Sequence, residues 1–167
     1  MEVYKIDKLM DETRRLAAEF RRATGQTLPV SAEIAKFDAM RLLGLRALPQ
    51  PLAGVDALGG EDHPDRRFQI KGRVIFNESK SVHRIGQLNV DGEWDVLVLV
   101  LMDENYQPLE IYEMDRATVV EALDGSDEKK RSKRGAMSIA KFKALGRRAW
   151  GAVVGKESDD VWENSSS

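Results

Sequence analysis

Apolar and polar positions alternate along the chain in a way that places helices at both ends and strands between them. In residues 3–22, apolar side chains recur every three or four positions, which predicts an amphipathic helix that ends at Gly25. A second helix is predicted over residues 32–44, with Ser31 as its N-cap. Both helices precede any segment with the pattern of a strand.

The middle of the chain carries strand patterns. Residues 55–58 and 68–76 are joined by a polar loop that contains glycine, which predicts a hairpin. Residues 94–102 form the most apolar segment, and continuous Val and Leu are typical of a strand buried on both faces. Residues 108–114 alternate and are predicted to be its partner strand.

Two helices are expected after the strands. Asp115 is predicted to cap a short helix that runs to Leu123, and Ser138 to cap a basic helix within residues 136–150. The order is therefore two helices, three or four strands and two helices. It predicts an α/β or α+β fold, with a central mixed β-sheet flanked by helices.

The length of 167 residues fits one domain with a sizeable core. We expect that domain to span residues 1–155, with its core in residues 30–115, and the acidic, serine-rich residues 156–167 to form a frayed tail.

Composition excludes several classes of site. The chain has no cysteine, so disulfides, zinc sites built on thiolates and a cysteine nucleophile are absent. The longest apolar run, residues 96–102, is too short to span a membrane, and the N-terminus lacks the apolar core of a signal peptide. We expect a cytoplasmic protein without a membrane segment.

Charge is distributed unevenly, although the net charge is only −2. Residues 103–128 hold nine acids and one base, whereas residues 129–148 hold nine bases and no acid. The basic segment can attract a polyanion such as DNA. It can equally be a solvated face that acids elsewhere balance.

Polar side chains in the predicted hairpin suggest a metal site. Gln69 and Lys71 lie two residues apart in a strand, so both point to the same side of the sheet, and Asp56 comes from the neighbouring strand. Mg²⁺ prefers oxygen ligands, which the Asp56 carboxylate, the Gln69 amide and the Ile70 carbonyl can supply. The Lys71 ammonium can then stabilise a phosphate oxygen or orient the attacking water.

Glu33 is a further candidate ligand. It is expected in the first turn of the second helix, where a carboxylate suits the helix dipole. Its spacing from Phe37 and Met40 predicts that it leans toward the inward face, where it can bind a metal directly or through water. The alternative interpretation is a surface glutamate that only complements the dipole.

These residues together resemble the PD-(D/E)xK nuclease superfamily, the restriction-endonuclease-like fold. The resemblance rests on the helical Glu33, on Gly54-Val55-Asp56 opening a strand and on Gln69-Ile70-Lys71 in the next strand, and it covers residues 30–115. Gln69 stands where the family usually has an acid, and Val55 where it usually has proline.

The resemblance implies Mg²⁺- or Mn²⁺-dependent cleavage of DNA, with Asp56, Gln69 and Glu33 at the metal and with Lys71 and Glu33 assisting the chemistry. A homodimer would supply two sites for two DNA strands. The basic side chains expected to contact the DNA backbone are Arg73, Lys80, Arg84, Lys141 and Lys143.

Other functions stay open at this point. A nuclease-like fold without activity can serve as a nucleic-acid or protein-binding module, and the four polar residues can be structural in a scaffold protein. Ser79 and Ser81 near His83 can form a nucleophile and base, but no orienting acid accompanies them.

Overall fold

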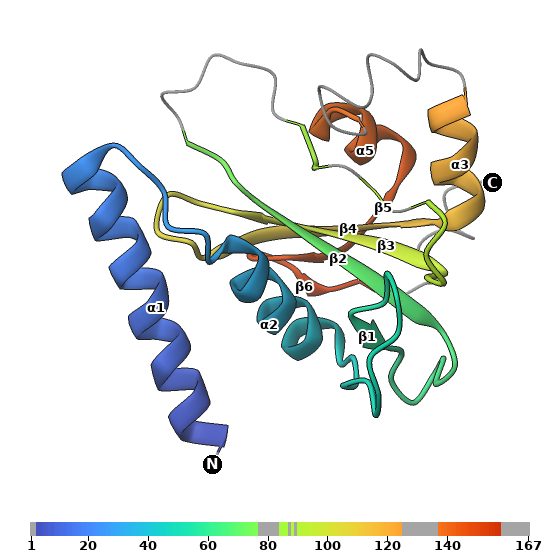
Figure 1. The fold of residues 1–167 in the computed structure, drawn as a ribbon, viewed down its shortest axis with the longest axis horizontal. Helices are drawn as coiled ribbons and strands as arrows, with labels where there is room; N and C mark the ends of the chain where they lie inside the picture. Colours follow the sequence, from blue (N-terminus) through green and yellow to red (C-terminus); the bar gives the residue numbers. More distant parts are fainter. Residues whose placement is uncertain (1–2, 77–83, 87, 89, 125–136, 158–167) are drawn as a thin grey trace.

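The computed structural model describes residues 3–76, 84–86, 88, 90–124 and 137–157. It contains a six-stranded sheet with helices on both sides (Figure 1). The elements in chain order are α1 Val3–Thr24, α2 Ser31–Leu43, β1 Ala57–Leu58, β2 Arg67–Val74, β3 Val96–Met102, β4 Pro108–Asp115, α3 Arg116–Asp124, α5 Ile139–Leu145, β5 Arg147–Gly151 and β6 Gly155–Lys156.

The strands lie in the sheet in the order in which they occur in the chain. β2 and β3 are parallel, and each of the other neighbouring pairs is antiparallel. The predicted fold class, an α+β domain with a central mixed sheet flanked by helices, is therefore confirmed. The predicted hairpin is confirmed as well, since β1 and β2 are antiparallel neighbours.

Two apolar cores cover the two faces of the sheet. On one face, α2 packs over Phe68, Ile70 and the even-numbered residues of β3, and Ala17 and Ala18 of α1 join this core at its margin. On the other face, α3 and α5 pack over Leu97, Leu99 and the remaining residues of β3. Every residue of β3 is buried, as its continuous apolar character predicts.

Gly72 allows α2 to lie close to β2. A Cβ at this position would fall 2.4 Å from the Cβ of Ala35 and 3.1 Å from the carbonyl oxygen of Ser31. The start of α2 is therefore fixed beside the middle of β2. Ser31 itself is the first residue of the helix rather than its N-cap; Val30 takes the cap position without a side-chain hydrogen bond, so the predicted cap is wrong.

The predicted C-terminal helix is wrong in its second half. Ser138 does cap it, accepting a hydrogen bond from the Lys141 N–H at 3.1 Å, but the helix ends at Leu145. Residues 147–151 instead form β5 beside β4, with Ala149 buried in the core. Pairing with β4 satisfies backbone groups that a helix would leave exposed along that edge of the sheet.

The core and the ordered chain extend further than predicted. Ala17 and Ala18 of α1 and Ala149 of β5 belong to the core on the α1 and α2 face, so the core is not confined to residues 30–115. Lys156 lies in β6 and Glu157 accepts hydrogen bonds from Arg148, so the chain is folded beyond residue 155. The rest of the predicted tail, residues 158–167, lies outside the described residues.

Among the described helices, none has the length and apolar character needed to cross a membrane.

Candidate functional site

Asp56 is fixed against β2 just before β1 begins. Its backbone N–H donates to the carbonyl oxygen of Phe68 at 2.7 Å, and its Oδ2 accepts from the N–H of Ile70 at 2.7 Å. The carboxylate therefore lies beside the backbone of Gln69 and Ile70. Its second oxygen, Oδ1, has no hydrogen bond to any residue that the structure describes, so it is available to a ligand.

Gln69 and Lys71 lie on one face of the sheet, as predicted. In the parallel register they stand beside Leu97 and Leu99, which belong to the core under α3 and α5, whereas Phe68 and Ile70 face α2. The Lys71 side chain is half-buried. Strand alternation thus brings an amide and an ammonium to the same surface.

The amide oxygen of Gln69 is the most unusual group at this position. Gln69 is only 6% exposed, and its Oε1 is buried with no hydrogen-bond partner among the described residues. A buried carbonyl without a partner costs about 1–3 kcal/mol, and native proteins keep few of them. The oxygen has the chemistry of a hard-metal ligand, as has the Oδ1 of Asp56, and oxygen ligands are those that Mg²⁺ and Mn²⁺ prefer.

Glu33 does not lean inward, so of the two interpretations that the sequence left open, the structure agrees with the surface glutamate. It is exposed, because α2 buries Ile34, Ala35 and Ala39 against the sheet and turns Glu33 away from it. α2 covers the face opposite to that of Gln69 and Lys71. The structure therefore does not bring Glu33 together with those two residues, and Glu33 makes no hydrogen bond with a described residue.

The structure describes Arg73 and Arg84 among the predicted DNA contacts of the central part of the chain, and only Arg73 shares a strand with the candidate site. Arg73 is exposed and follows Lys71 on the same face of β2. Arg84 forms an isolated bridge with Ser138, and its Nε is buried without a partner among the described residues. Lys80, like Ser79, Ser81 and His83, lies outside the described residues.

The basic C-terminal segment is largely neutralised where the structure describes it. Lys143 Nζ lies 3.2 Å from Glu110 Oε1, and Lys141 Nζ donates to the carbonyl oxygen of Ala122 at 3.2 Å. Arg147 pairs with Glu113, and Arg148 with Glu157. Acids on β4 and after β6 thus balance Lys143, Arg147 and Arg148. Residues 129–134 lie outside the described part.

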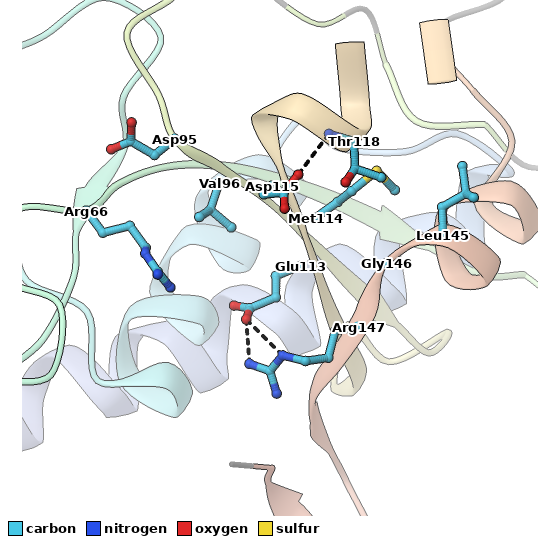
Figure 2. A pocket seen from close by; sticks show the side chains of 10 residues that line it. All are labelled: Arg66, Asp95, Val96, Glu113, Met114, Asp115, Thr118, Leu145, Gly146 and Arg147. Carbon is cyan, nitrogen blue, oxygen red and sulfur yellow. Dashed lines mark hydrogen bonds and ion pairs between the residues drawn. The ribbon is translucent and has the colours of Figure 1, made fainter. Parts of the chain in front are cut away.

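A cavity of about 660 Å³ lies away from these residues, and sequence reasoning did not predict it. Figure 2 shows Arg66 and Arg147 on either side of Glu113, and Asp95 and Asp115 also line the cavity. Its lining comes from β3, β4, α3, α5, β5 and the residues just before β2 and β3, a convergence that only the folded sheet creates. None of Glu33, Asp56, Gln69 and Lys71 lines it.

The acids of this cavity already have partners. Glu113 Oε1 accepts from Arg147 Nε at 3.2 Å, and Asp115 Oδ1 accepts from the Thr118 N–H at 2.8 Å. Hydrogen bonding from the Thr118 side chain, and then from its backbone N–H, holds the pKa of Asp115 below its usual value. Burial raises the pKa of Asp95, but the hydrogen bonds from Arg67 outweigh burial and bring it below its usual value. These carboxylates are structural ion-pair and capping groups.

Within the described ranges, no three acidic or histidine side chains group closely enough to hold a metal ion. The candidate site accordingly has one fixed carboxylate, Asp56, and one neutral amide, Gln69, rather than an acidic cluster. Any metal affinity depends on the Gln69 oxygen more than it would in a site with three acids.

Replacing Gln69 by leucine tests whether the amide oxygen is unsatisfied in the absence of metal. In EDTA, the free energy of unfolding should stay unchanged or rise by up to ~2 kcal/mol, because the change removes a buried carbonyl without leaving a cavity. Urea denaturation measures it, with Gln69→Ala as the variant that leaves a cavity. A loss of more than ~1 kcal/mol in the leucine variant would mean that the amide is hydrogen-bonded in the folded protein.

Comparison of the chain with protein-family models and with curated proteins gives no match, so the geometry of these residues carries the functional argument.

Proposed function

We propose that the chain is a Mg²⁺- or Mn²⁺-dependent deoxyribonuclease of the PD-(D/E)xK type. The observation that carries the proposal is the buried, unpartnered Oε1 of Gln69, in a strand whose backbone holds the Asp56 carboxylate and whose next residue on that face is Lys71. A metal bound there would act as a Lewis acid on the phosphate and lower the pKa of a bound water.

Asp56 and Gln69 have distinct roles in this proposal. The hydrogen bond from the Ile70 N–H to Asp56 Oδ2 fixes the carboxylate and leaves Oδ1 without a hydrogen bond to a described residue. The burial of Gln69 fixes the amide, so that both oxygens are held before the ligand arrives. Preorganised ligands avoid the entropic cost of ordering two free side chains.

Lys71 is the charged group that can meet the substrate. β1 pairs with β2 through Ala57 and Leu58, so no described strand covers the β1 side of β2 beyond Ile70. A phosphate approaching this edge would meet Lys71, a half-buried residue, and then the exposed Arg73. Lys71 would stabilise the charge that develops on the phosphate oxygens or orient the attacking water.

Cleavage of supercoiled plasmid DNA tests this function. The protein should convert plasmid to nicked or linear forms with Mg²⁺ or Mn²⁺, and EDTA in excess should abolish the reaction. A cytoplasmic location and a homodimer with one site per DNA strand are consistent with such a substrate. Equal cleavage with and without EDTA would point to a contaminating or metal-independent activity.

The second candidate function is a nuclease-like module that binds nucleic acid without cutting it. Two observations favour it: Gln69 brings no negative charge to the site, and Glu33 lies over the opposite face of the sheet. A gel shift of duplex DNA in EDTA, with binding that weakens as salt rises, together with no cleavage in Mn²⁺, would identify this function.

A further inference from the structure

An apolar stripe runs along the outer side of α1. Its members follow the alternating three- and four-residue spacing of a coiled-coil seam and are Ile6, Leu9, Thr13, Leu16 and Phe20. Ile6 is 39% exposed, Leu9 50% and Leu16 61%, although these are large aliphatic side chains. We call these five residues the α1 stripe.

The α1 stripe is not the surface that holds α1 to the domain. α1 contacts the rest of the chain through Arg14, Ala17 and Ala18, which are buried, and through Met10, which packs at the edge of the core. These residues lie on the side of the helix next to the stripe. α1 stands at the margin of the molecule, so its outer side faces away from the sheet (Figure 1).

We propose that the α1 stripe pairs with the α1 stripe of a second copy of this chain, with the two helices antiparallel about a two-fold axis. The charges that flank the stripe favour a second copy of the chain as its partner. Lys5, Glu12 and Glu19 are exposed and follow one flank of the stripe at intervals of seven residues. They therefore form a single row beside the apolar seam.

An antiparallel pair matches opposite charges in this row. When Ile6 of one helix lies against Leu16 of the other, Lys5 faces Glu19 of the second copy at both ends of the contact, by symmetry. Near the two-fold axis, Glu12 of one chain faces Glu12 of the other. The contact therefore has two attractive charge pairs and one repulsive pair. The ion pair that Glu19 forms within its own helix is weak, because Arg15 Nη1 lies 4.0 Å from Glu19 Oε1 and both side chains are exposed.

A parallel pair would not match these charges. In that arrangement the row would face the opposite flank of the second helix, where Met10, Ala17 and Thr24 carry no charge. Ala17 is also fully buried in its own domain. The antiparallel arrangement keeps the two domains at opposite ends of the helix pair, because the buried contacts of α1 lie in its C-terminal half.

The contact is short, so the dimer should be weak and dependent on concentration. α1 has 22 residues, which supply three heptads. The helix is already formed against its own domain, so association orders little additional chain.

Sedimentation equilibrium of the full chain tests the surface. Leu9→Glu combined with Leu16→Glu should raise the dimer Kd by roughly 30-fold or more, since charges would replace the apolar centre of the contact. Val153→Glu is the control, because Val153 is 98% exposed in the turn between β5 and β6 and lies outside the stripe. Far-UV circular dichroism should be the same for all variants. A wild-type chain that stays monomeric at roughly millimolar concentration, or a dimer that both variants leave unchanged, would overturn the proposal.

A charge exchange tests the orientation. Lys5→Glu and Glu19→Lys should each weaken the dimer by about tenfold at low salt, and the double variant Lys5→Glu/Glu19→Lys should restore wild-type affinity. Restoration requires residue 5 to face residue 19 of the other copy, since the two lie four helical turns apart on one helix. A double variant as weak as the single variants would overturn the antiparallel arrangement.

Discussion

Replacing Lys71 by methionine should lower the rate of Mg²⁺-dependent DNA cleavage by roughly 10²–10⁴-fold. Methionine keeps an unbranched apolar stem of similar length, so the half-buried position in β2 should stay filled. What is lost is the ammonium that would stabilise the phosphate or orient the water. The measurement is the initial rate of plasmid nicking at saturating metal.

Lys36→Met is the matched control, because Lys36 is also a half-buried lysine but lies on α2, over the opposite face of the sheet. It should cleave at the wild-type rate. The melting temperature and Mn²⁺ affinity of Lys71→Met should stay near wild type, which separates a chemical role from a structural one. Cleavage by Lys71→Met at the control rate would remove Lys71 from the proposed mechanism.

Replacing Asp38 by alanine should lower the free energy of unfolding by about 3–5 kcal/mol. Asp38 is fully buried on α2, and its Oδ2 accepts from Arg14 Nη1 of α1 at 2.8 Å. Arg14, only 3% exposed, also donates to the carbonyl oxygen of Tyr106 at 2.6 Å. Without Asp38, a guanidinium stays buried without its counter-charge, unless α1 moves away from the domain. Urea denaturation measures the loss.

Hydrogen exchange distinguishes the two ways in which the loss can arise. Faster exchange confined to α1 would show that the helix detaches to expose Arg14, and the double variant Arg14→Met/Asp38→Leu should recover most of the stability. Asp7→Ala, an exposed acid on the same helix, is the control and should change the stability by less than ~0.5 kcal/mol. An Asp38→Ala variant as stable as this control would show that the ion pair contributes little.

Local sequence patterns were sufficient to predict the elements whose type and burial follow from their own periodicity. Continuous Val and Leu predicted β3 and its burial on both faces, and alternation predicted β4. Gly25 and Gly44 end their helices with positive φ, as glycine allows. Strand alternation also predicted that Gln69 and Lys71 share a face.

Long-range contacts decided the features that the sequence predicted wrongly or left open. Residues 147–151 come directly after α5, and Gly146 is the one residue between them that disfavours a longer helix. They form a strand because they pair with the edge of β4. For Glu33, the spacing to Phe37 and Met40 favoured the inward face, but the close approach of α2 at Gly72 sets a different rotation of the helix.

The buried polar groups could not be recognised from sequence either. Arg14 and Asp38 are 24 residues apart, and each reads as an ordinary charged position on an amphipathic helix. The cavity of Figure 2 is lined from five separate elements. For Gln69, the motif indicated the residue, but its buried, unpartnered oxygen is a property of the folded chain alone.

Mn²⁺ binding, measured by isothermal titration calorimetry on the wild type and on Gln69→Leu, tests the proposed site most directly. The Oε1 of Gln69 is the ligand with no alternative partner among the described residues, and the leucine variant is expected to stay folded. The wild type should bind one Mn²⁺ per chain, and Gln69→Leu should bind it at least about tenfold more weakly. Equal affinities for the two proteins, or no binding by the wild type up to roughly 1 mM Mn²⁺, would contradict a metal site at Asp56 and Gln69.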